Sequence, residues 1–223
     1  MIIKFAKLIG RSPSALNMKI GNFGRLDPEL GKRGIVGLAN GSKLEEVVWA
    51  EFHGNWEKLT YESELIISRL QNKSIKETFK MDLSDIPQGI DKESVVKRRV
   101  NQSFFRSTIL SSYNNRCCIT GLPIPELLVA SHIIPWSQNK QERLNPRNGL
   151  CLNSIHDRAF DRGLITISSN YRVILSKYLE EHGVEDSVHD FFARYDNQAI
   201  DLPDKFAPNP DFLKFHYEHI FRK

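Results

Sequence analysis

The chain has 223 residues, 40% of them hydrophobic and 26% charged, which fits a globular protein of one medium or two small domains. No apolar run approaches the roughly 20 residues that a membrane span needs, and the start of the chain is too short and too charged for a signal peptide. Three cysteines, an odd number, give no disulfide framework, so we expect a cytoplasmic protein without a membrane partner.

The net charge of +4 is unevenly distributed along the chain. Residues 1–43 carry eight Lys or Arg against two acids, and residues 92–116 carry six against one. Residues 179–204 show the opposite balance, with eight acids and Arg194 as the single fixed cation. A polyanion would favour the first two regions and avoid the third, although ordinary solvated surface explains the charges equally well.

The first predicted elements are two short helices. Residues 3–9 are expected to form one helix, which Gly10 ends, and Ser12 is a good N-cap for the next. This spacing is typical of a helix-turn-helix, in which Lys19 would face outward and contact DNA. A plain helical hairpin accounts for the same pattern.

The rest of the N-terminal part is predicted to be a glycine-rich loop at 21–43 followed by helices at 44–53 and 60–71. The apolar side of the helix at 44–53 is expected to consist of Leu44, Val47, Val48 and Phe52. We therefore interpret 1–71 as a helical, basic, DNA-binding region. Residues 72–93 are polar and are interpreted as a linker.

A longer helix is predicted from about 94 to 113. Its buried side is expected to consist of Val95, Val96, Val100, Phe104, Ile109 and Leu110. Another face carries Arg99, Gln102 and Arg106, beside Arg98. These four residues are candidate DNA contacts. The same face could instead support a neighbouring site or be solvated.

Three polar residues then follow in order. His132 lies in an apolar strand from 129 to 134, Asn148 precedes a second strand at 149–152, and His156 starts a short helix that Gly163 ends. A neutral histidine can deprotonate water, and one divalent ion can stabilise the charge on a phosphate that is attacked by that water. The order predicts a one-metal phosphodiesterase site.

This series resembles the HNH nucleases, and its flanks resemble prokaryotic HNH restriction endonucleases. The flanking runs are Arg99-Val-Asn-Gln102-Ser-Phe-Phe-Arg106, Cys118-Ile-Thr-Gly121, Phe160-Asp161-Arg162-Gly163 and Leu213-Lys-Phe-His216-Tyr. The resemblance covers about 97–223 and is looser over 5–60. It implies a ββα-metal fold that binds Mg²⁺ or Mn²⁺. In such a fold His132 is the general base, Asn148 ties the loop and orients His132, and His156 binds the metal.

The chain departs from the family pattern before His132. Many HNH nucleases have a second metal ligand there, whereas this chain has Ser131, a poor ligand. Asp161 is our candidate for the second ligand, and a salt bridge with Arg158 or Arg162 is the alternative. Asp157 is expected to point to another side of the helix.

A second departure concerns zinc. Many HNH domains hold a structural zinc ion with two Cys-x-x-Cys pairs, but here Gly121 and Ser154 stand where the partners of Cys118 and Cys151 would be. We predict no structural zinc, with both cysteines acting as small buried apolar residues. His216, in the family-like tail, is expected to pack.

The predicted fold class is α+β. A mainly helical N-terminal part precedes a ββα-metal nuclease domain over 94–223, which includes a β-hairpin at 164–175 and a helical tail.

The predicted function is that of a metal-dependent DNA endonuclease of the restriction or defence type. One site cuts one strand, so a double-strand break requires a homodimer or two binding events. A nonspecific or partner-gated effector nuclease is one alternative. A non-catalytic DNA-binding protein with a decayed site is another, and Ser131 is the residue that favours it.

Overall fold

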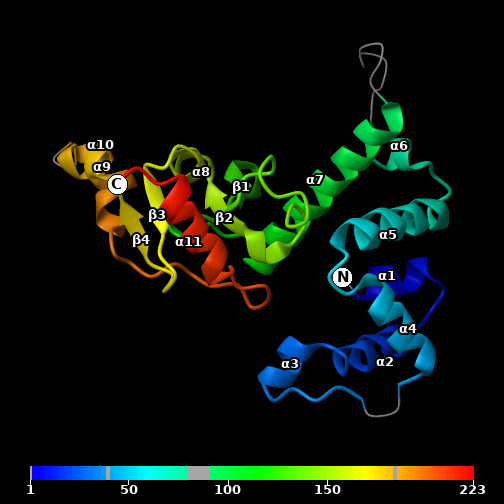
Figure 1. Cartoon of the computed structure of the whole chain (residues 1–223). Coiled ribbons are helices and arrows are strands. Elements are labelled where there is room, and N and C mark those ends of the chain that lie inside the picture. Colours follow the sequence, from blue (N-terminus) through cyan, green and yellow to red (C-terminus); the bar gives the residue numbers. More distant parts are fainter. Residues whose placement is uncertain (1, 39–40, 80–90, 183–184) are drawn as a thin grey trace. The chain divides into compact units, whose positions relative to one another are not determined.

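The computed structural model describes residues 2–38, 41–79, 91–182 and 185–223. The chain divides into an N-terminal unit, residues 1–101, and a C-terminal unit, residues 102–223. The N-terminal unit is helical where it is described, whereas the C-terminal unit combines two small antiparallel sheets with helices (Figure 1). The predicted α+β class, with a helical part first, is confirmed.

The N-terminal unit consists of consecutive helices. They are α1 (Ile2–Leu8), α2 (Pro13–Gly24), α3 (Pro28–Lys32), α4 (Lys43–Phe52), α5 (Trp56–Leu70), α6 (Ile75–Thr78) and the first half of α7 (Lys92–Ser112). Ser12 caps α2 by accepting a hydrogen bond from the Ala15 N–H at 3.2 Å. Helix α6 lies within the segment interpreted as a linker, of which residues 80–90 are outside the described ones.

Helix α4 buries a different side from the one expected. Leu44 and Val47 are 70% and 61% exposed, whereas Glu45 is 3% exposed. The Glu45 carboxylate accepts hydrogen bonds from Lys19 Nζ and Asn22 Nδ2 of α2 and from the Ser42 N–H, and the bonds from Lys19 and then Asn22 do most to lower its pKa to about 2. This charged network, which the hydrophobic pattern does not reveal, decides which side of α4 faces α2.

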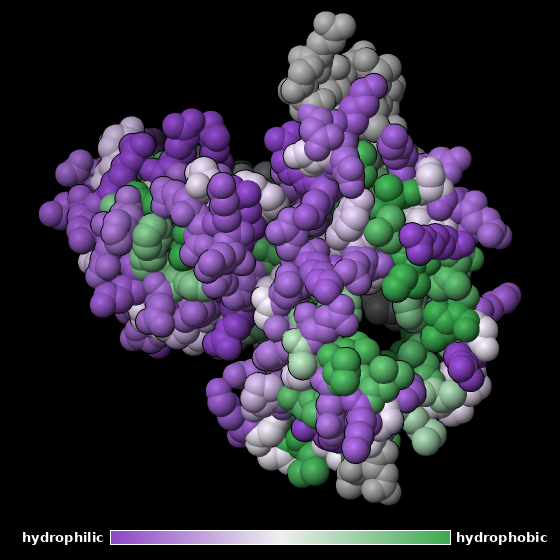
Figure 2. Space-filling model, turned by 45° about the vertical axis from the view of Figure 1, so that its right-hand side comes forward, coloured by the Kyte–Doolittle hydropathy of each residue, from purple (hydrophilic) through white to green (hydrophobic). Residues whose placement is uncertain are grey.

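The N-terminal unit exposes many large apolar side chains. Among its described residues, the buried apolar side chains are Ala6, Val96 and Val100. Those that remain exposed include Ile3, Met18, Ile20, Val36, Leu44, Val47 and Ile66. Figure 2 shows hydrophobic surface gathered in patches on the face of the molecule that it draws.

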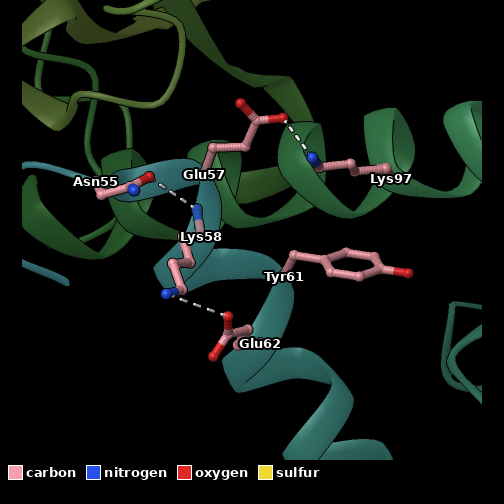
Figure 3. Close-up of a pocket in the computed structure, with 6 residues that line it drawn as sticks. All are labelled: Asn55, Glu57, Lys58, Tyr61, Glu62 and Lys97. Carbon is pink, nitrogen blue, oxygen red and sulfur yellow. Dashed lines mark hydrogen bonds and ion pairs between the residues drawn. The ribbon is translucent and has the colours of Figure 1, made fainter. Parts of the chain in front are cut away.

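A cavity of about 260 Å³ in the N-terminal unit is lined by α5 and α7 (Figure 3). Its charged groups pair with one another or with close neighbours. Lys97 Nζ lies 2.9 Å from Glu57, and Lys58 Nζ lies 2.7 Å from Glu51 and 3.9 Å from Glu62. One ion pair, Lys97–Glu57, therefore joins the two helices at this cavity, and the lining includes none of the residues predicted to be catalytic.

The C-terminal unit begins with the second half of α7 and contains the predicted ββα arrangement. Strands β1 (Leu128–His132) and β2 (Gly149–Asn153) pair antiparallel, with His132 opposite Gly149, and α8 (Ser154–Asp161) follows at once. The predicted hairpin is formed by β3 (Ile165–Ile167) and β4 (Val173–Leu175). The tail consists of α9 (Lys177–Glu181), α10 (Asp186–Phe191) and α11 (Pro210–His219).

A dense apolar core holds these elements together. Its fully buried members come from α7, α8, α11 and all the strands except β4, and include Ile109, Phe160, Leu128, Leu150, Leu152, Ile165, Ile167 and Leu213. Helix α7 packs so closely on β2 that a Cβ at Gly149 would lie 2.4 Å from Ile109 and 2.9 Å from Phe105. Among the described residues, no helix is both long and apolar enough to cross a bilayer.

Two predicted environments in this unit can be compared with the structure. In α7, Phe105 is buried and Phe104, expected to be buried, is only half-buried. Cys118 and Cys151 are free and buried, and burial raises the pKa of both thiols, that of Cys151 to about 12. These thiols therefore stay protonated and pack as small apolar groups.

Candidate active site

His132 ends β1, and its ring lies between two aromatic side chains. The Phe105 ring stacks on it with centroids 3.9 Å apart and planes 10° apart, and the Trp136 ring meets it edge-on at 5.4 Å. His132 Nε2 lies 2.9 Å from the Arg143 carbonyl oxygen. The half-buried ring is thus fixed in orientation by contacts on several sides.

The hydrogen bond of His132 determines its tautomer. A carbonyl oxygen only accepts, so Nε2 carries the hydrogen and Nδ1 keeps its lone pair. Burial lowers the pKa of His132 below its ordinary 6.5, against the opposing effects of the bond to Arg143 and of the Asp161 charge. At neutral pH the ring is therefore neutral, and Nδ1 is its basic atom.

Asn148 connects the two ends of the loop between β1 and β2. Its Oδ1 accepts a hydrogen bond from the Ile134 N–H at 2.8 Å, and its Nδ2 donates to the carbonyl oxygens of Ile134 and Glu142, both at 3.2 Å. Ile134 lies two residues after His132, and Glu142 precedes Arg143. Asn148 therefore holds both backbone segments that orient the His132 ring.

Asp161, at the end of α8, lies close enough to His132 for the two charges to interact. Partial burial raises the pKa of Asp161, and the positive charges of Arg158, His132 and Arg162 oppose the rise. No ion pair joins Asp161 to either arginine in the part of the chain that the structure describes. Asp161 is exposed, and its charge and that of His132 affect each other's pKa.

Asp157 lies one helical turn before Asp161, so the two side chains share a face of α8. Burial raises the pKa of Asp157, the Ser131 side chain opposes the rise, and the charge of Asp161 adds to it. Asp157 therefore lies on the same side of α8 as Asp161 and on a different side from its neighbour His156. The i, i+4 spacing of the two acids was the signal in the sequence that their side chains share one side of the helix.

His156 lies in a closed environment. Its Nδ1 accepts a hydrogen bond from Asn153 Nδ2 at 3.0 Å, and its Nε2 donates to the Phe191 carbonyl oxygen at 2.6 Å. The rings of Phe192 and Tyr195 meet it edge-on, and it is 2% exposed. Both ring nitrogens of His156 are therefore engaged by other groups of the protein.

The helix geometry separates His156 from the two acids of α8. His156 and Phe160 are four residues apart and form the buried side of α8, whereas Asp157 and Asp161 lie on the side that reaches β1. The Cys117 thiol is a neighbour of His156. Burial raises the pKa of this thiol, but hydrogen bonds from His156, Thr120 and the backbone outweigh that effect and lower it to about 7.

Asp161, whose charge interacts with His132, and Asp157, whose charge interacts with Asp161, are side chains that suit a divalent ion. Carboxylate oxygens are preferred ligands of Mg²⁺ and Mn²⁺, and a cation near Asp157 and Asp161 would relieve the repulsion that raises the pKa of Asp157. Within the described ranges, no group of three or more His, Cys, Asp or Glu side chains is arranged to hold a metal ion. Two carboxylates fit an ion such as Mg²⁺, which keeps several water ligands.

The predicted DNA contacts on α7 do not form a uniform set. Arg98, Arg99 and Gln102 are exposed. Arg106 instead donates to the carbonyl oxygens of Leu128 at 2.8 Å and Pro125 at 3.1 Å, so it supports the start of β1.

Lys19, the remaining predicted contact, has its ammonium group bound by Glu45, although its side chain is 60% exposed.

Residues 117–168, which include β1, β2, α8 and β3, match the family model HNH_2, described as HNH endonuclease. The chain contains an HNH endonuclease domain. The predicted HNH endonuclease domain is confirmed over these residues.

A solved structure described as "Modification dependent TagI restriction endonuclease" is similar to 50% of this chain, with 15% sequence identity and a TM-score of 0.36. The similarity covers 35% of that protein, so the chain spans about a third of its length. No curated protein matches the chain.

The HNH domain contains one further cation beside the candidate base that the sequence did not single out. Arg143 Nε donates to the Trp136 carbonyl oxygen at 2.6 Å, and its guanidinium lies 5.1 Å from the centre of the Trp136 ring. Burial is the main cause that lowers the pKa of His132, and the charge of Arg143 lowers it further. No spacing rule marks this arginine, because it lies in the loop whose course is determined by Asn148.

Proposed function

We propose that the HNH domain cleaves DNA with His132 as the general base and with a single divalent ion held by Asp161 and Asp157. The observation that carries this proposal is the hydrogen bond from His132 Nε2 to the Arg143 carbonyl oxygen. It directs the proton of a neutral imidazole to Nε2 and leaves Nδ1 able to take a proton from water.

The proton transfer is supported by the surroundings of His132. The lowered pKa keeps the ring unprotonated at neutral pH, so the base is ready before the substrate arrives. Once Nδ1 has accepted the proton, the negative charge of Asp161 stabilises the imidazolium, because that charge favours protonated His132. Asn148 keeps the ring aligned through Ile134 and Glu142.

The carboxylates of Asp157 and Asp161 are assigned to metal binding. When bound, Mg²⁺ or Mn²⁺ would supply positive charge to the phosphate and to the leaving oxygen. Arg143 is assigned to contact with the phosphate, since its charge lies beside the base. We assign His156 to holding α8 rather than to the metal, because its two nitrogens are engaged by Asn153 and Phe191.

The biological role that we propose is restriction or defence. The flanking runs that resemble prokaryotic HNH restriction endonucleases support it, and so does the excess of positive charge in 1–43 and 92–116. Arg98, Arg99 and Gln102 are the α7 residues assigned to DNA. A nonspecific or partner-gated nuclease remains the second candidate, and a homodimer would allow both strands to be cut.

Plasmid cleavage tests the proposed chemistry. Supercoiled plasmid incubated with the protein and Mg²⁺ or Mn²⁺ is expected to be nicked or linearised. His132→Ala should abolish cleavage while DNA binding, measured by gel shift, is retained. His189→Ala, the same change at an exposed histidine of α10, should cleave normally. Equal cleavage by wild type and His132→Ala contradicts the role of His132.

The product pattern separates the two roles. Discrete fragments from modified or unmodified genomic DNA, with ends that share a sequence, indicate restriction. A smear of fragments with unrelated ends indicates the nonspecific alternative.

A further inference from the structure

The C-terminal turn of α8, which carries Asp161, is held by a residue from far along the chain. His216 of α11 is 1% exposed, and its Nε2 lies 3.1 Å from the Phe160 carbonyl oxygen. Its ring stacks on the Phe160 ring with centroids 3.7 Å apart and planes 13° apart. Phe160 immediately precedes Asp161, so His216 contacts both the backbone and the side chain of the residue next to the candidate metal ligand.

The orientation of His216 is fixed by two hydrogen bonds. The Phe160 oxygen accepts, so His216 Nε2 carries the hydrogen, and Nδ1 then accepts from Thr166 Oγ1 at 2.8 Å. Thr166 lies on β3 and is fully buried. Rotation of the ring would break both bonds inside the core, where unpaired polar groups are costly. The His216 ring is therefore a rigid connection between β3, α11 and the end of α8.

A backbone contact reinforces this connection directly after α8. The Arg222 N–H donates to the Gly163 carbonyl oxygen at 2.9 Å. Gly163 has a φ of +67°, and a Cβ there would lie 2.1 Å from the Ile220 oxygen. The segment that follows α11 therefore lies against the residue that ends the α8 turn, and α11 itself packs against β3 (Figure 1).

We propose that His216 is a positioning residue that sets the direction of the Asp161 carboxylate toward His132 and the metal. This inference rests on the proposed function, in which Asp161 is a metal ligand. Partners that orient metal ligands typically contribute about 10- to 100-fold to metal affinity or activity. A residue that only packs would affect stability and leave metal affinity unchanged.

The test measures Mn²⁺ binding to the full chain without DNA, by calorimetry or electron paramagnetic resonance, together with plasmid nicking against metal concentration. His216→Phe keeps a ring on Phe160 but removes both hydrogen bonds. It is expected to weaken Mn²⁺ binding about tenfold and to reduce nicking most at low metal. His216→Gln, which retains an N–H donor, should recover part of the affinity.

His219→Phe is the matched control, because His219 is an exposed histidine of the same helix that stacks on Phe215. Its Mn²⁺ affinity should stay within about twofold of wild type. Thr166→Val removes the hydrogen bond that fixes the His216 tautomer while keeping the shape of the side chain. It should weaken Mn²⁺ binding several-fold. If circular dichroism shows that His216→Phe does not fold, the Mn²⁺ affinity of Thr166→Val decides whether His216 positions Asp161.

Asp161→Asn separates this inference from the proposed function. If Asp161→Asn binds Mn²⁺ as wild type does, Asp161 is not a ligand and the proposed function fails at that point. If Asp161→Asn loses affinity while folded His216→Phe and Thr166→Val keep it, the ligand assignment stands and the positioning role of His216 is overturned.

Discussion

The two units of the chain keep their structure by different means. In the C-terminal unit the strands and helices surround a core of fully buried aliphatic and aromatic side chains, and the HNH residues project from elements that this core fixes. In the described N-terminal unit, few apolar side chains are buried, and polar networks such as that of Glu45 determine how helices face one another. Catalytic geometry needs the first kind of support, because close packing restricts side-chain and backbone movement.

The same substitution in the two units should give the largest contrast. Leu150→Ala removes a fully buried side chain of β2 and is expected to lower the free energy of unfolding by about 2–5 kcal/mol. Leu44→Ala, on α4, should change it by less than about 0.5 kcal/mol, since Leu44 is 70% exposed. Urea unfolding followed by circular dichroism measures both. Similar losses would show that Leu44 is buried in solution and would remove the contrast.

Acidification should weaken the C-terminal unit through His216. Burial lowers the pKa of His216 from 6.5 to about 4, so between these values the unfolded chain binds a proton that the folded chain excludes. This contribution is fully present above pH 6.5 and is lost as the pH falls to 4, for a total of about 3 kcal/mol. His216→Phe should show a flatter dependence of unfolding free energy on pH, and parallel curves for the two proteins would contradict it.

The Glu45 network of the N-terminal unit should lose its contribution to stability at a lower pH than His216 does. The pKa of Glu45 is lowered from 4.5 to about 2, so its contribution is present above pH 4.5 and is lost as the pH falls toward 2. The difference in free energy of unfolding between wild type and Glu45→Gln should therefore become smaller only below pH 4.5. A difference that already narrows at pH 6 would mean that Glu45 is not the group responsible.

The Mg²⁺ concentration needed for nicking should depend on the acids of α8 and not on Glu45 of the N-terminal unit. Asp157→Asn is expected to raise the Mg²⁺ concentration for half-maximal nicking by about tenfold, because it removes one of two ligand charges. Asp190→Asn, at an exposed acid of α10, and Glu45→Gln, in the N-terminal unit, should leave it unchanged. A shift in Glu45→Gln as large as that in Asp157→Asn would show that metal binding is not confined to the HNH domain.

The smallest expected effect is on the pH dependence of catalysis. Because burial lowers the pKa of His132 below 6.5, kcat/KM should remain constant as the pH falls to 6.5 and decline only below it. Phe105→Leu, which removes the stacked ring, should move the decline to slightly higher pH by admitting water to His132. Plasmid nicking at saturating metal between pH 5 and 8 measures the shift, and an unchanged profile in Phe105→Leu would exclude this role for the ring.

The sequence predicted those parts of the molecule that depend on local pattern. The two strands, the helix that follows them and the hairpin were predicted from apolar runs bounded by turn residues, and the structure contains all of them. The positions of His132 and Asn148 followed from the motif, because each lies at the end of an element. Their hydrogen-bond partners lie in the intervening loop, which has no regular spacing.

Which side of each helix is buried was harder to predict, because contacts with distant segments of the chain determine it. His156 binds Phe191, because α10 offers a carbonyl oxygen 35 residues further along the chain. Leu44 is exposed because Lys19 and Asn22, on another helix, bind Glu45. Phe105 is buried in place of Phe104 because Gly149 leaves room for α7 on β2.

The separation of 56 residues between Phe160 and His216 has a consequence for the order in which the protein becomes active. During synthesis, β1, β2 and α8 leave the ribosome well before α11. Until α11 docks, the last turn of α8 has no histidine on its backbone and no partner at Gly163. A nascent chain that already contains every residue of the HNH motif therefore still lacks the contacts that hold the last turn of α8.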